Sequence, residues 1–103
     1  MLGLLITQHG TLTVLDDTIS TVGCCAGAGS SVLAGCDVDL YLTGEMSHHD
    51  VLAATSQGIS VILLDHSNSE RGFLTHLKSR LSDKLPNVEL VISETDRDPL
   101  VIM

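Results

Sequence analysis

The 103-residue sequence lacks tryptophan and has only one phenylalanine and one tyrosine, so its core must be built from aliphatic side chains. No apolar run approaches the roughly 20 residues that a membrane-spanning helix needs. Residues 1–6 are apolar but too short and uncharged for a secretory signal. We therefore expect one small, soluble, intracellular domain, cytoplasmic or else nuclear or mitochondrial, with no membrane partner.

Cysteine and positive charge are also scarce. The three cysteines include the adjacent pair Cys24 and Cys25 and show no C-x-x-C spacing, so neither a disulfide framework nor a thiolate zinc site is indicated. Five Lys and Arg residues stand against 13 Asp and Glu, giving a net charge of −8. With no basic stripe to neutralise phosphates, direct nucleic-acid binding is not expected. A phosphorylated substrate would need metal ions to supply positive charge.

From residue 19 onward, apolar runs alternate with segments of helical periodicity. The patterns predict strands at 19–26, 38–42, 60–64 and 88–92, and helices at 30–35, 47–57 and about 69–84. This order predicts an α/β fold, a βαβαβαβ unit with a mainly parallel sheet and right-handed crossovers. Residues 1–18 form a separate segment, either a hairpin of 2–7 with 11–15 or a lead-in without fixed structure.

Polar residues and glycines gather at three predicted strand-to-helix junctions, residues 25–31, 43–50 and 65–70. In an open parallel sheet, ligands bind beyond the carboxyl ends of the strands, where these junctions meet. Three of the five histidines lie in these segments. The clustering predicts a functional site at this edge of the sheet.

The third junction carries the most specific pair, His66 and Glu70. Their spacing of four places an imidazole and a carboxylate on one face of a helix. Such a pair suits a divalent ion of the zinc, manganese or iron type. The alternative is that Ser67 and Glu70 form a capping box and that His66 is an ordinary, partly buried histidine. The spacing alone does not decide between the two interpretations.

The second junction holds the tandem His48-His49. Ser47 is expected to cap the following helix, with Asp50 in its first turn. Because adjacent residues on a helix cannot face one point, at most one of the two histidines is expected to enter a site.

The first junction contains Gly27 and Gly29, which resemble the start of a dinucleotide fingerprint. Val32 occupies the third glycine position and no Walker lysine follows, so only a glycine turn that allows close backbone approach is predicted. The acidic segment 93–99 is predicted to be a solvated loop.

Four segments taken in order closely resemble the NIF-three-like family, also called type-two GTP cyclohydrolase I. They are CAGAGSSVL (25–33), DLYLTGEMSHHD (39–50), DHSNSERG (65–72) and SETDRDP (93–99). The likeness runs from about residue 20 to 103 and is closest to the animal members. It implies that residues 19–103 are the C-terminal half of the family fold and that residues 1–18 diverge.

The resemblance implies an α/β protein whose two similar halves face a dinuclear metal site and which commonly assembles into a ring-shaped hexamer. It further implies that His66 and Glu70 are metal ligands, that Glu70 can touch both ions, and that His49 lies beside the site. The family's other ligands, a His-His-Pro motif and an aspartate, belong to its N-terminal half. Here the only early histidine, His9, is followed by Gly10. The chain is therefore expected to be a fragment or alternative product with an incomplete site and weak metal binding.

Two functions follow from the resemblance. One is a metal-dependent hydrolase or GTP cyclohydrolase-like activity of a full-length, homo-oligomeric parent, with no catalytic residue assigned in this chain. The other is a non-catalytic adaptor that binds a transcription regulator. Whether this chain is itself an enzyme stays open. In either case, apolar surface is expected to be exposed where the other half is absent.

Overall fold

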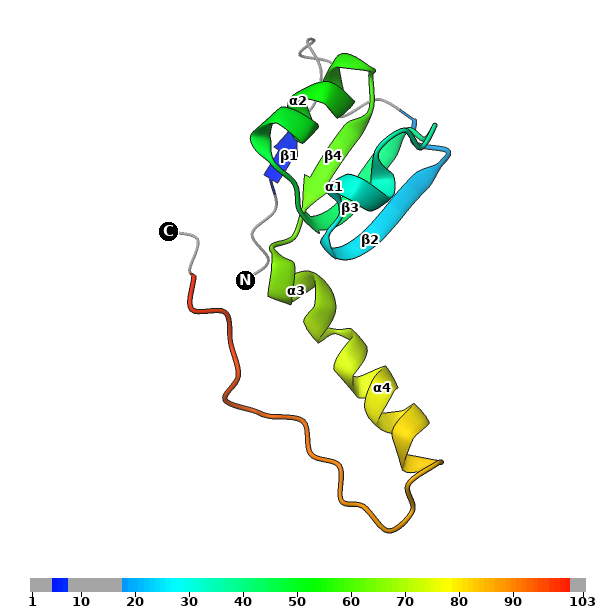
Figure 1. Cartoon of the computed structure of the whole chain (residues 1–103), viewed down its shortest axis with the longest axis vertical. Coiled ribbons are helices and arrows are strands. Elements are labelled where there is room, and N and C mark those ends of the chain that lie inside the picture. Colours follow the sequence, from blue (N-terminus) through cyan, green and yellow to red (C-terminus); the bar gives the residue numbers. More distant parts are fainter. Residues whose placement is uncertain (1–4, 8–17, 101–103) are drawn as a thin grey trace.

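The computed structural model describes residues 5–7 and 18–100. They contain a four-stranded sheet in the order β1-β4-β3-β2. Strands β2, β3 and β4 are parallel, whereas β1 runs antiparallel to β4 (Figure 1). The strands are β1 (Leu5–Thr7), β2 (Val22–Ala28), β3 (Leu40–Glu45) and β4 (Ser60–Leu63). The predicted α/β fold with a mainly parallel sheet is therefore confirmed.

Helices connect and follow the parallel strands. They are α1 (Ser30–Leu33), α2 (His48–Ser56), α3 (His66–Arg71) and α4 (Phe73–Ser82). Helices α1 and α2 are the two crossovers, and both cover the same face of the sheet (Figure 1). The predicted helix at 69–84 begins earlier, at His66, and is divided at Gly72 into α3 and α4.

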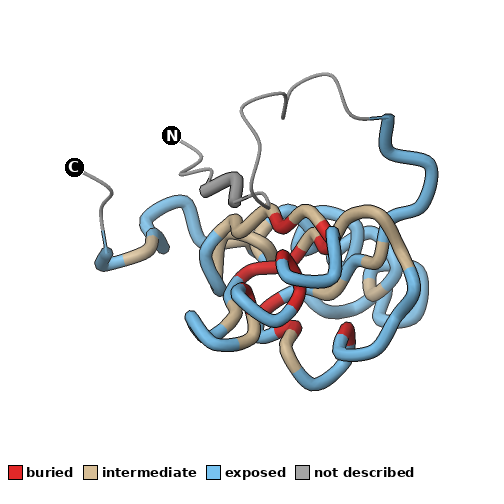
Figure 2. Tube along the Cα trace, turned by 90° about the horizontal axis from the view of Figure 1, so that it is seen from above, coloured by how far each residue is buried: buried red, intermediate tan, exposed pale blue. Residues whose placement is uncertain are grey.

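The core lies between the sheet and the helices α1 and α2. Val61 is fully buried and Thr43 is 1% exposed, because both face the helices from the middle of the sheet. The other buried apolar side chains are Leu33, Tyr41, Val51, Ala54 and Ile59. Figure 2 shows these buried residues gathered in the middle of the molecule. Leu42 and Ile62 alternate with them on the opposite face and are half-buried.

The predicted fourth strand at 88–92 is wrong. These residues form an irregular extended segment, and the fourth strand of the sheet is β1, which pairs Leu5 with Leu63 and Thr7 with Val61. The reason is that β1 occupies the edge next to β4, while α4 carries the following chain away from the sheet (Figure 1). Leu90, Val91 and Ile92 instead line a hollow together with apolar side chains of α4. The alternative hairpin with 11–15 lies outside the described residues.

Helix α4 projects from the rest of the molecule, and the chain beyond it turns back toward α3 (Figure 1). The radius of gyration is 16.7 Å, against about 13 Å for a compact domain of 100 residues. None of the residues of α4 is buried, and Phe73, Leu74 and Leu77 are exposed. Apolar surface is thus exposed along this arm. No helix within residues 5–7 and 18–100 is long and apolar enough to cross a membrane.

Candidate metal centre

Helix α3 starts at the carboxyl end of β4 through an unusual turn. Asp65 takes φ 67° and ψ 149°, a conformation that residues other than glycine rarely adopt, and His66 is the first residue of the helix. The N-cap is Asp65, no side chain caps the helix, and Ser67 lies inside it. The predicted capping box between Ser67 and Glu70 is therefore wrong, because the helix begins before Ser67.

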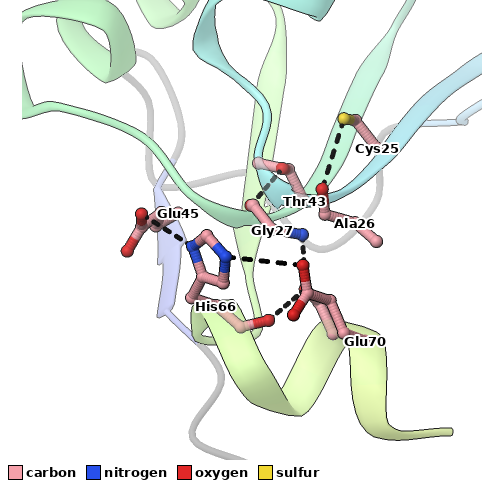
Figure 3. Close-up of polar contacts among 8 residues, drawn as sticks. Cys25, Ala26, Gly27, Thr43, Glu45, His66 and Glu70 are labelled. Atoms are coloured by element: carbon pink, nitrogen blue, oxygen red, sulfur yellow. Dashed lines mark hydrogen bonds and ion pairs between the residues drawn. The ribbon is translucent and has the colours of Figure 1, made fainter.

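The imidazole of His66 lies between two carboxylates (Figure 3). Its Nδ1 is 2.9 Å from Oε1 of Glu45, the last residue of β3, and its Nε2 is 3.4 Å from Oε1 of Glu70. The side chains of Glu45, His66 and Glu70 are 57%, 47% and 52% exposed, respectively. The structure thus brings the predicted pair together on one helix face and adds Glu45, which the sequence did not single out.

The two carboxylates make a positive charge favourable at this site. The hydrogen bond to Glu45 raises the pKa of His66, as do the charges of Glu70, Glu45 and Asp98, while partial desolvation opposes them. When Nδ1 donates to Glu45, a neutral imidazole presents the lone pair of Nε2 to the Glu70 carboxylate. Two acceptors facing each other repel, so the space between them favours a positive charge, either a proton or a metal ion.

The separation of these two atoms fits a metal ion. Two ligand atoms bound at about 2.1 Å to one tetrahedral ion lie about 3.4 Å apart, and Nε2 of His66 is 3.4 Å from Oε1 of Glu70. Within the described part of the chain, however, no group of three or more His, Cys, Asp or Glu side chains is arranged to hold an ion. By distance alone, the pair could fill two coordination positions of one ion.

Gly27, near the carboxyl end of β2, leaves room in front of this pair. A Cβ on Gly27 would lie 2.8 Å from Oε1 of Glu70 and 3.1 Å from Nε2 of His66, and the residue has φ +69°. Both the space and the backbone conformation therefore require glycine. The predicted close backbone approach at this junction is confirmed, and what it approaches is the His66–Glu70 pair.

Two hydroxyls, those of Ser69 and Thr43, join the three junctions. The Gly27 N–H donates to Oγ of Ser69 at 2.8 Å, and the Ser69 hydroxyl donates to the carbonyl of His66 at 2.6 Å. The Thr43 hydroxyl donates to the Gly27 carbonyl at 3.2 Å. A Cβ on Gly44 would lie 2.5 Å from Oγ of Ser69, so this glycine lets α3 approach the end of β3. Sequence reasoning missed these contacts.

Comparison with known proteins identifies the family. The sequence profile of the Duf34/NIF3 (NGG1p interacting factor 3) family matches residues 3–99. The chain belongs to the Duf34/NIF3 family. The match begins inside the first 18 residues, which the motifs had left outside the resemblance.

Individual NIF3 relatives agree with this assignment. The chain is 61% identical over 90 residues to NIF3-like protein 1 of Bos taurus, covering 86% of this chain and 24% of that protein. It is 49% identical over 87 residues to NGG1-interacting factor 3 of Saccharomyces cerevisiae, covering 82% and 30%, respectively. The crystal structure of a Bacillus cereus protein related to NIF3 shares the fold, with a TM-score of 0.78, 24% identity, and coverage of 98% and 28%. The chain spans about a quarter of the length of the animal relative.

The tandem histidines of this NIF3-family chain lie on the first turn of α2. Ser47 caps that helix as predicted: its hydroxyl donates to Asp50 at 2.6 Å and accepts the Asp50 N–H at 3.2 Å. Hydrogen bonds from Ser47 and Ser30 lower the pKa of Asp50. Both histidines are exposed and their ring centroids are 6.1 Å apart.

His49 stays a candidate neighbour of the His66–Glu70 pair. Among residues 18–100, no polar contact joins it to His66 or Glu70. The position of His49 beside the site therefore stays a prediction from the family resemblance.

The acidic segment near the C-terminus is anchored rather than freely solvated. Nε of Arg71 is 3.0 Å from Oδ2 of Asp96, and Nη1 of the same guanidinium donates to Asn68 at 2.9 Å. The Ser93 hydroxyl accepts the backbone N–H of Asp96 at 3.1 Å. The negative charge of Asp98 contributes to raising the pKa of His66. The prediction of a loop holds, but the loop is tied to α3 through Arg71, next to Glu70.

Proposed function

We propose that this chain contributes His66 and Glu70 to a dinuclear site for divalent zinc, manganese or iron-type ions in a NIF3-family protein. One observation carries the proposal: Nε2 of His66 and Oε1 of Glu70 lie 3.4 Å apart in front of a glycine whose Cβ would fill the space between them. Ligands that complete the site would come from outside the described residues.

The proposed activity is that of a metal-dependent hydrolase or GTP cyclohydrolase-like enzyme. When bound, divalent ions lower the pKa of a coordinated water and stabilise negative charge on an anionic substrate. His66 and Glu70 would hold the ions, and Gly27 would keep the approach to them open. The net charge of −8 supports a role for metal in this activity, because the chain has few basic side chains that could bind an anionic substrate.

Two donors alone hold a transition metal weakly, because structural and catalytic zinc sites use three or four protein ligands. We expect calorimetric titration of this chain with zinc or manganese to show weak binding that His66→Ala/Glu70→Ala removes. The control is His76→Ala, which removes an exposed imidazole from α4. Tight, stoichiometric binding by the 103-residue chain would contradict the two-ligand account.

Activity is tested in a full-length relative, assayed against GTP and a panel of phosphoesters. We expect turnover in the wild type and its loss when the histidine and glutamate equivalent to His66 and Glu70 are replaced by alanine. Equal turnover in both proteins would overturn the hydrolase proposal.

A second candidate function is an adaptor that binds a transcription regulator. The name of the yeast relative, NGG1-interacting factor 3, supports a protein partner. An adaptor would be favoured by partner capture that survives His66→Ala/Glu70→Ala, together with no turnover in any assay. Capture that is lost in the double variant would instead connect the partner to the His66–Glu70 pair.

We also propose that the protein self-associates. The exposed apolar side chains of α4 support this, because apolar patches on a soluble chain are commonly covered by association. Light scattering is expected to show an oligomer, and a well-folded monomer at high concentration would contradict self-association.

A further inference from the structure

We infer that Glu45 is a positioning residue for the His66–Glu70 pair: its carboxylate holds His66 in the Nδ1–H tautomer and leaves the lone pair of Nε2 free to face a metal ion. The inference rests on the proposed metal site. Its geometric basis is the 2.9 Å contact between Nδ1 of His66 and Oε1 of Glu45. Nothing in the local sequence around His66 points to Glu45, which lies 21 residues earlier.

The two carboxylates that touch His66 have different roles because they lie on opposite sides of its ring (Figure 3). The lone pairs of the two imidazole nitrogens diverge, so an ion bound at Nε2 cannot also be bound by the group that contacts Nδ1. Glu70 shares the Nε2 side and fits as a ligand. Glu45 contacts Nδ1 and fits as the outer partner of a carboxylate–histidine–metal arrangement.

The backbone around Glu45 holds its carboxylate in place. The Glu45 carbonyl accepts the N–H of Gly29 at 3.2 Å, which ties the end of β3 to the glycine turn after β2. Gly44 lets the start of α3 pack closely against this end of the strand, since a Cβ there would lie 3.0 Å from the Asp65 carbonyl. Thus both partners of the Glu45–His66 contact stand on anchored backbone, although their side chains are about half exposed.

The direct test is the tautomer of His66 in the metal-free chain, measured from the imidazole ¹⁵N shifts at a pH where the ring is neutral. A neutral histidine in water favours the Nε2–H form. We expect wild-type His66 to be mainly Nδ1–H and Glu45→Ala to shift it toward Nε2–H. Glu45→Gln is expected to keep Nδ1–H, because the amide oxygen can still accept that proton. A mainly Nε2–H wild-type ring would overturn the inference without any variant.

A matched control separates the hydrogen bond from a change in net charge. Glu89→Ala removes one negative charge from an exposed position of the tail. We expect it to leave the tautomer of His66 unchanged. An equal shift in Glu89→Ala and Glu45→Ala, or no shift in Glu45→Ala, would contradict a positioning role.

Metal binding gives the second readout. Loss of an outer carboxylate partner typically weakens metal affinity roughly 10- to 100-fold, so we expect a manganese titration of Glu45→Ala to show a loss in this range and Glu89→Ala to show none. Unchanged affinity in Glu45→Ala would contradict the inference. If the wild type binds no manganese but keeps the Nδ1–H form, the proposed metal site fails while the tautomer assignment stands. The two failures are therefore distinguishable.

Discussion

Gly27 and Glu70 are separated by 43 positions in the sequence, yet a Cβ on Gly27 would lie 2.8 Å from Oε1 of Glu70. The end of β2 therefore limits which side chains can lie in front of the carboxylate near the end of α3. This closeness links the conformation of one junction to the accessibility of the His66–Glu70 pair at another.

Replacing Gly27 by alanine is predicted to weaken metal binding as well as stability. Alanine at φ +69° costs about 1–2 kcal/mol in backbone conformation, and the added methyl group displaces the Glu70 carboxylate. Gly35→Ala is a matched control, because Gly35 has φ +79° and a Cβ there meets nothing within 4 Å. Urea unfolding should show a lower free energy of unfolding for both variants. Manganese titration should show a lower metal affinity for Gly27→Ala alone. Equal metal affinity in the two variants would contradict the steric account.

Ser69→Ala is predicted to destabilise the chain by roughly 1–2 kcal/mol, because it leaves the part-buried Gly27 N–H without its acceptor. Ser67→Ala makes the same change on the same helix but leaves that hydrogen bond intact, so it should cost little. The measurement is the midpoint of urea unfolding for both variants. Similar midpoints would show that the Ser69 hydroxyl does not hold the junction.

Acid is predicted to destabilise the chain partly through Asp39. Hydrogen bonds from the backbone N–H groups of Ser20 and Thr21 and from the Thr21 hydroxyl lower the pKa of Asp39 below its ordinary value of 3.8. A carboxyl with a lower pKa in the folded state stabilises the fold above the unfolded-state value, and this contribution is lost as the pH falls through the folded-state pKa.

The free energy of unfolding should therefore fall more steeply between about pH 5 and about pH 2 in the wild type than in Asp39→Asn. Asp37→Asn removes the same charge from the same loop and should retain the wild-type slope. Identical slopes in Asp39→Asn and the wild type would show that these hydrogen bonds do not contribute to acid sensitivity.

Arg71→Ala is predicted to release the acidic segment from α3. The ion pair with Asp96 is partly exposed, so the free energy of unfolding of the chain should fall by less than about 1 kcal/mol. The local mobility of the acidic segment should rise more, because the Arg71 guanidinium pairs with Asp96 in that segment. Cleavage after Glu94 by a glutamate-specific protease should speed up in Arg71→Ala and stay unchanged in Arg80→Ala, the control on α4. Equal cleavage in both would mean that Arg71 does not anchor the segment.

The parallel part of the fold could be predicted because its signals are local. The apolar run that contains Val61 gives a strand buried in the middle of the sheet, and the polar junctions follow such strands. The run at 88–92 carries a similar signal but is not a strand. Strand propensity does not tell whether a sheet edge is free, and here β1 occupies the edge beside β4.

The site was predictable only along one helix. The spacing of His66 and Glu70 predicts that they share a face, and they do. The contact of Glu45 with His66 depends on how the end of β3 lies against the start of α3, which no spacing reveals. The glycine before Glu45 was the available signal, since close packing requires it.

His66 and Glu70 are proposed to bind a divalent ion together. The most direct measurement is paramagnetic broadening of the amide NMR signals of this chain by manganese. We expect broadening to begin around residues 66–70 and at Gly27, to persist in His76→Ala, and to disappear from this region in His66→Ala/Glu70→Ala. Broadening that starts in the acidic segment 93–98, or that is unchanged in the double variant, would contradict the claim.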